Sequence, residues 1–159
     1  MSPADARLLL LCAELERELR EVERHRARAM SASPTDSEHA AAFVALELDH
    51  AYQAFESLLL RLERGLGLPV RVGATWHRAL LEDAALEIPK LRPAVVPYAV
   101  AADWSTVMGF RHFLRHAYAT ELDLEKLVKA RAALDRAVIA TVPVVTRVIA
   151  ALRDADPPE

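Results

Sequence analysis

The chain has 159 residues, of which 53% are hydrophobic and 27% charged, with a net charge of −3 and a pI near 6.1. This length predicts a single helical domain over residues 1–159 that buries its own core. The charge balance disfavours a broad, non-specific nucleic-acid binder, since such proteins are usually basic overall, but it allows a local basic site. One cysteine, Cys12, excludes a disulfide framework, and its apolar surroundings predict a buried, inert thiol.

Apolar residues that recur every three or four positions predict five helices. The second helix begins after a cap at Asp36 or Ser37 and ends near Arg64. The other four are predicted at Pro3–Met30, Thr75–Leu86, Tyr98–Ala119 and Leu124–Asp154. No strand, repeat or glycine-rich phosphate loop is predicted, so the expected fold class is all-α, an antiparallel bundle of four to five helices.

Prolines and caps refine these boundaries. Ser2 is the expected cap of the first helix, and Pro143 predicts a kink or a local break in the last one. The three prolines of EIPKLRPAVVP predict an extended connection before the fourth helix. Residues 155–159 are expected to be a frayed tail.

No stretch of the chain resembles a signal peptide or a membrane span. The N-terminal apolar run is short and lies between charged residues, and the late apolar stretch, residues 134–152, contains three charges and a proline. We therefore expect a cytoplasmic protein that does not enter a membrane.

The stretch FRHFLRHAY, residues 110–118, collects arginine, histidine and aromatic side chains. On a helix, Arg111, Arg115 and Tyr118 share one face, and His112 and His116 share a neighbouring one. Arg111 and His116 are about 140° apart on an ideal helix. They converge on one small ligand only if the helix end deforms, or if the ligand lies in a groove between two copies of the helix.

These side chains match the needs of RNA cleavage without a metal. An arginine stabilises the extra negative charge on a phosphate under attack, and a histidine transfers a proton near neutral pH. The 2′-hydroxyl of RNA is a built-in nucleophile, so Arg and His form a sufficient minimum set. The spacing alone does not define a site, because Arg20 and His25 are spaced in the same way.

Three segments resemble the HEPN superfamily and, within it, the HepT-like ribonuclease toxins. GFRHFLRHAYATELDLEKL carries their R-x4-H-x-Y signature as Arg111, His116 and Tyr118. WHRALLEDAALEIPKLRP is similar to their short helix, which opens with a Trp-His pair, and AYQAFESLLLRL is similar to their second helix. The resemblance covers residues 44–128.

The resemblance implies roles for these residues. Arg111 and His116 would be the catalytic pair of an endoribonuclease, and Tyr118 would accept AMP from a partner nucleotidyltransferase antitoxin of the MntA type. It also implies a homodimer in which the two motifs meet at a cleft, with RNA as substrate and no cofactor. A bulky anion on Tyr118 would block the cleft and neutralise its arginines.

Other polar residues have weaker assignments. Arg115 and His112 are candidate RNA contacts, and for Arg115 an ordinary solvated role is the alternative. His112 and His116 have the spacing of a metal-ligand pair, but no HExxH motif or cysteine cluster accompanies them, so no metal site is predicted. His77 has two alternatives, to line the cleft or to support the connection, of which the second is favoured, and no role is assigned to His50.

The remaining aromatic and histidine residues have structural expectations. His25 and His39 are expected at the surface. The core or a dimer interface is expected to hold Trp76, Trp104, Phe110 and Phe113.

Two rival functions remain open at this stage. One is a non-catalytic HEPN-type helical subunit that binds or regulates a nucleotidyltransferase. The other is a helical dimer in which the basic stretch is merely interface.

Overall fold

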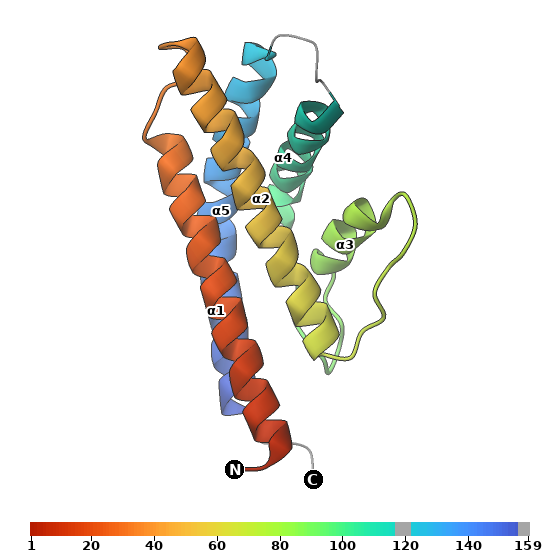
Figure 1. The fold of residues 1–159 in the computed structure, drawn as a ribbon. Helices are drawn as coiled ribbons and strands as arrows, with labels where there is room; N and C mark the ends of the chain where they lie inside the picture. Colours follow the sequence, from red (N-terminus) through yellow and green to blue (C-terminus); the bar gives the residue numbers. More distant parts are fainter. Residues whose placement is uncertain (117–121, 156–159) are drawn as a thin grey trace.

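The computed structural model describes residues 1–116 and 122–155, apart from the side chain of His116. The described residues form five helices: α1 (Pro3–Met30), α2 (Glu38–Gly65), α3 (Trp76–Ala84), α4 (Tyr98–His116) and α5 (Leu124–Asp154). The predicted all-α bundle is confirmed. Figure 1 shows α1, α2, α4 and α5 running side by side, with α3 to one side across α2 and α4.

The long helices begin at capped residues. At α1, the backbone N–H of Asp5 donates to Ser2 Oγ at 3.1 Å, and the N–H of Ser2 donates to the Asp5 carboxylate at 2.7 Å, which completes a capping box. Ser37 accepts a hydrogen bond from the N–H of Ala40 and caps α2. Both caps agree with the sequence prediction, with Ser37 rather than Asp36 in the second.

The core lies between α1, α2, α4 and α5. Trp104 of α4 is fully buried and stacks on Phe55 of α2, with ring centroids 3.7 Å apart. Its indole N–H donates to Thr141 Oγ1 of α5 at 3.0 Å, so the one polar atom of the ring is satisfied. This side chain therefore fixes α4 against both α2 and α5, as the sequence led us to expect for Trp104.

The other residues expected in the core follow the same pattern. Phe110 is buried, while Trp76 and Phe113 are partly buried against the core. Cys12 is fully buried, and burial raises the pKa of its thiol above the ordinary value. This agrees with the predicted buried thiol.

The connection from α3 to α4 is not extended throughout, contrary to the prediction. Ile88 and Arg92 pair as a single bridge, and Lys90 between them takes a left-handed conformation with φ of 67°. Beyond this turn, the N–H groups of Val95 and Val96 both donate to the carbonyl of Ala84. The three prolines exclude a helix here, but they leave room for a tight turn.

Arg92 holds this turn together. Its side chain is 1% exposed, and its Nε donates to Glu63 of α2 at 2.8 Å. Its other nitrogens donate to the carbonyl oxygens of Asp83, Leu86 and Pro93 at 2.8–3.1 Å. One buried guanidinium therefore satisfies the end of α3, the turn and α2 together.

Two predictions about helices differ from the structure. Helix α3 ends at Ala84 rather than Leu86, and α5 continues through Pro143 without a break. The described part of α4 ends at His116, and the rest of the helix predicted to Ala119 lies outside the described residues. Most of the expected frayed tail, residues 156–159, lies outside them as well.

The length and hydropathy of the described helices decide whether any of them could span a membrane. In the described ranges, none is both long and apolar enough to span a bilayer.

Replacing Arg92 tests whether this buried ion pair holds the α3 region. Arg92→Gln leaves Glu63 as a buried carboxylate without its partner, which should lower the free energy of unfolding by about 3–5 kcal/mol in a urea titration. The matched control is Arg71→Gln, because Arg71 bonds Asp83 at 3.0 Å nearby but is 58% exposed. We expect little change in the control. An equal loss in both variants would contradict this account.

Candidate functional site: a basic pocket between α3 and α4

Ionisable side chains gather around a hollow between the start of α3 and the last turns of α4. This basic pocket has a volume of about 420 Å³ and is lined by five groups able to bind anions or carry protons: His77, Arg78, Arg111, His112 and Arg115. The first two come from α3 and the other three from α4. Two helices that are distant in sequence therefore bring these groups together.

The side chain of Arg111 forms ion pairs with two carboxylates of α2. Its Nε donates to Asp49 Oδ1 at 2.8 Å, and an Nη atom lies 3.9 Å from Glu56 Oε1. Its side chain is 11% exposed, so these two carboxylates determine where the guanidinium lies. The Tyr52 ring lies 5.9 Å from the guanidinium carbon. Burial, followed by repulsion from Glu56, raises the pKa of Tyr52, so the buried phenol behind Arg111 is neutral.

His77 faces the same carboxylate from α3. Its Nδ1 lies 2.6 Å from Glu56 Oε2, and its ring stacks on Trp76 with centroids 3.6 Å apart. A carboxylate oxygen accepts, so Nδ1 is the donor in this contact. His77 also lines the pocket, which was the less favoured of its two alternatives from the sequence.

The two residues predicted to contact RNA, His112 and Arg115, both line the pocket. His112 and Arg115 are both exposed and line its α4 side. Arg78 lines the α3 side, is also exposed, and had no role in the sequence analysis. The pocket thus combines one anchored arginine with two exposed ones.

Gly109 forms part of the α4 wall of the pocket. A Cβ built at this position meets no atom of the chain within 4 Å, so packing inside the chain does not require glycine here. Glycine inside a helix costs about 0.5–1 kcal/mol relative to alanine. Its presence leaves the α4 backbone open to close approach from the pocket side.

Two predicted residues cannot be placed in this geometry. His116 is the last residue of α4, and its side chain is not described. Tyr118 lies outside the described residues. Their predicted roles stay predictions.

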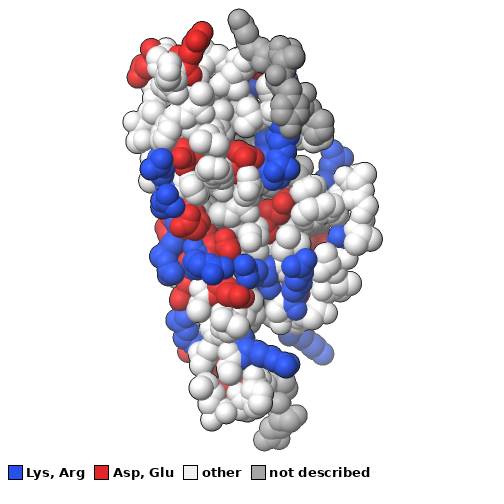
Figure 2. Space-filling model, in the orientation of Figure 1, with Lys and Arg blue, Asp and Glu red and all other residues white. Residues whose placement is uncertain are grey.

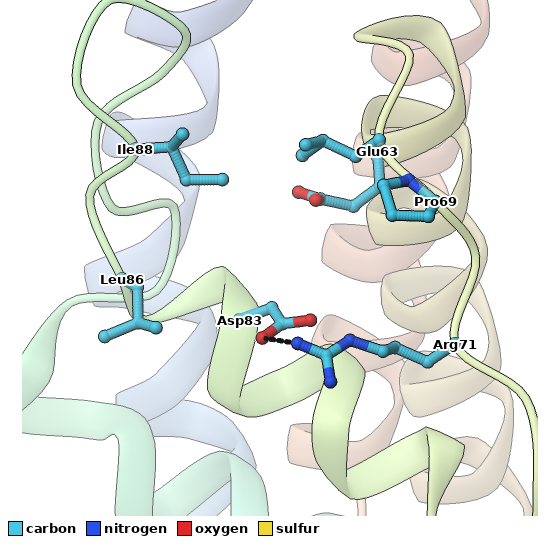
Figure 3. A pocket seen from close by; sticks show the side chains of 7 residues that line it. Glu63, Pro69, Arg71, Asp83, Leu86 and Ile88 are labelled. Atoms are coloured by element: carbon cyan, nitrogen blue, oxygen red, sulfur yellow. Dashed lines mark hydrogen bonds and ion pairs between the residues drawn. The ribbon is translucent and has the colours of Figure 1, made fainter.

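Two further pockets lack this combination of groups. Figure 3 shows a pocket of about 160 Å³ between the end of α2 and α3, where Arg71 already bonds Asp83 at 3.0 Å and Glu63 is taken up by Arg92. A groove of about 550 Å³ beside the C-terminal half of α5 is mainly apolar, and Arg147 is among its few charges. Neither holds a histidine.

Charges over the rest of the visible face are mixed. Figure 2 shows Lys and Arg atoms interleaved with Asp and Glu atoms over α1 and α2. Several charged residues form ion pairs between helices, such as Arg61 with Glu14 and Glu18, and Arg153 with Glu16. That face offers no broad basic surface, which agrees with the expectation from the net charge.

Residues 40–152 match the family model described as HepT-like protein. The chain belongs to the HepT-like family. The match covers α3, α4 and nearly all of α2 and α5, including every residue that lines the basic pocket. Comparison with curated proteins and with solved structures gives no significant match.

Asp49 and Glu56 are site residues that the sequence analysis missed. They lie seven positions apart on α2, which is two helical turns, so both lie on the side of α2 that contacts Arg111. That i, i+7 spacing of carboxylates on an otherwise apolar stripe was the available signal.

Proposed function

We propose that this chain is the toxin of a toxin–antitoxin pair, a metal-independent endoribonuclease that acts in the cytoplasm. The observation that carries the proposal is the basic pocket, where anchored Arg111 and carboxylate-oriented His77 face exposed arginines. Membership of the HepT-like family supports the same reading. The reaction would be attack of a ribose 2′-hydroxyl on the adjacent phosphate, which breaks the bond to the 5′-oxygen and leaves a 2′,3′-cyclic phosphate.

In this mechanism Arg111 stabilises charge. Its guanidinium is held by Asp49 through Nε, so the nitrogens at its far end are directed by a fixed scaffold. Donors that are already in place stabilise the pentavalent phosphate without reorganisation in the transition state. Arg78 and Arg115, both exposed, would hold the phosphates on either side of the scissile one.

Two histidines would handle the protons. His116 keeps the acid–base role that the R-x4-H-x-Y signature assigns to it. His77 is the second group, because Glu56 fixes its ring and leaves Nε2 for exchange with the substrate. One histidine would take the proton of the 2′-hydroxyl and the other would give a proton to the 5′-oxygen as it leaves.

The partner and the assembly complete the proposal. A nucleotidyltransferase antitoxin would transfer AMP to Tyr118, and two copies of the chain would form a homodimer around the cleft. On a regular helix, Arg111 and His116 point about 140° apart, which favours a site between two copies.

A second candidate function is a non-catalytic subunit that binds or regulates the nucleotidyltransferase. The observation that favours it is the pairing of Arg111 with two carboxylates, which leaves less of its charge for a substrate. Such a subunit would bind RNA weakly and would not cleave it.

Cleavage of a short RNA by the purified protein separates the two functions. The wild type should cut in the presence of EDTA and yield a 2′,3′-cyclic phosphate. Arg111→Gln and His116→Ala should each lower the cleavage rate by about 100-fold or more, and His77→Gln should lower it by about 10-fold or more.

The control is Arg24→Gln, because Arg24 is exposed on α1 and bonds only its helix neighbour Glu21. It should cut at the wild-type rate. Wild-type cleavage that requires Mg²⁺, or cleavage that survives in Arg111→Gln, would contradict the proposal. No cleavage by any form under these conditions would favour the non-catalytic subunit.

The proposed switch has its own test. Incubating the chain with its nucleotidyltransferase and ATP should add the mass of AMP in an intact-protein mass spectrum, with loss of RNA cleavage. Tyr118→Phe should keep cleavage and remain unlabelled. Equal labelling of Tyr118→Phe would show that the acceptor is another residue.

A further inference from the structure

A cluster of three metal-ligating side chains lies between α1 and α2, outside the basic pocket. His25 comes from α1, and Glu47 and His50 come from α2. One ligand atom from each, a ring nitrogen or a carboxylate oxygen, lies within 4.8 Å of the other two. His25 and Glu47 are 13% and 3% exposed, so the cluster is shielded but still within reach of solvent.

The spacing on α2 suits a metal. Glu47 and His50 are three positions apart, which places both on one face of the helix. This Glu-x-x-His spacing projects two ligands from one helix toward a facing helix, an arrangement used in metal-binding helical bundles. Here the facing helix supplies His25.

The outer contacts of the cluster are arranged as they are around bound metals. Nδ1 of His25 lies 2.5 Å from Glu47 Oε2, and the other ring nitrogen of His25 lies 3.3 Å from Glu21. The second oxygen of Glu47 accepts a hydrogen bond from Arg28 at 2.9 Å. A ligating histidine usually donates its other N–H to a carboxylate, and ligating carboxylates are themselves hydrogen-bonded. Glu21 and Arg28 fill those two places.

A purely structural ion-pair network explains only part of this arrangement. His25 and Arg28 already satisfy Glu47, so such a network has no need of His50. The His50 ring nevertheless lies edge-on to that of His25, with centroids 5.0 Å apart. Two imidazoles and a carboxylate thus meet at one point, which is the donor set of a metal site rather than of an ion pair.

We propose that His25, Glu47 and His50 bind one zinc ion. The ligands are Nδ1 of His25, Oε2 of Glu47 and one ring nitrogen of His50, with a water in the fourth position. Imidazole and carboxylate ligands suit zinc among the first-row divalent metals. Tetrahedral bonds of 2.0–2.1 Å require ligand atoms about 3.3 Å apart. In the structure the His25 and Glu47 atoms are 2.5 Å apart and all three ligand atoms lie within 4.8 Å of one another, so the first pair would separate by about 0.8 Å on binding.

Zinc titration of the tag-free, chelator-treated chain tests this site. Isothermal calorimetry at neutral pH should give one zinc per chain, and saturating zinc should raise the thermal unfolding midpoint, because a ligand that binds only the folded state stabilises it. His50→Gln leaves the His25, Glu47 and Arg28 contacts in place, so it should fold normally. It should bind zinc at least about 10-fold more weakly and lose most of the zinc-dependent shift.

The matched control is His39→Gln, since His39 is an exposed histidine on the same helix. It should bind zinc as the wild type does. Cobalt provides a second readout, because a four-coordinate Co²⁺ ion absorbs visible light strongly and His50→Gln should lose that absorption. One-to-one zinc binding that persists in both His50→Gln and His25→Gln, or the absence of any zinc binding by the wild type, would overturn the proposal.

Discussion

The carboxylate of Glu56 links α2 to α3 and α4, the two helices that line the basic pocket. One oxygen lies 2.6 Å from His77 of α3, and the other lies 3.9 Å from Arg111 of α4. Glu56 itself is 8% exposed on α2, so it can hold this charge only because the two partners surround it. Removing the carboxylate would leave His77 without this partner, while Arg111 would be held by Asp49 alone, so the link between α3 and α4 through Glu56 would be lost.

Helix α2 carries buried glutamates that pair with side chains of neighbouring segments. Three buried glutamates, Glu47, Glu56 and Glu63, each take a cation or an imidazole from a different segment of the chain. Burial acts to raise the pKa of Glu47, but hydrogen bonds from His25 and Arg28 outweigh it and lower the pKa below the ordinary value. Since a buried charge without a partner is costly, the pairings fix how each neighbouring segment sits on α2. The basic pocket and the proposed zinc site are two consequences of the same arrangement.

The fold was largely predictable because it follows from local patterns. The apolar stripes gave the five helices, and the caps at Ser2 and Ser37 set two of their starts. The turn held by Arg92 was not predictable in this way, since it depends on a buried ion pair with Glu63, 29 positions earlier in the chain.

The candidate site was predictable only in part. The motif on α4 pointed to Arg111, His112 and Arg115, which do line one pocket. The i, i+7 spacing on α2 marks Asp49 and Glu56, but their pairing with Arg111 of α4 and His77 of α3 depends on tertiary packing. The same limit applies to His25, which was expected at the surface but is largely buried beside Glu47. Long-range charge pairing, rather than helix formation, is what the sequence pattern left out.

The central claim is that RNA binds in the basic pocket between α3 and α4. The most direct test is an NMR titration of the labelled chain with a short RNA whose 2′-hydroxyls are replaced by hydrogen, so that it binds without being cut. The account predicts the largest amide shifts at His77, Arg78, Gly109 and Arg115, with affinity that falls steeply as salt rises. Shifts concentrated on α1 and the outer face of α5, with those four amides unmoved, would contradict it.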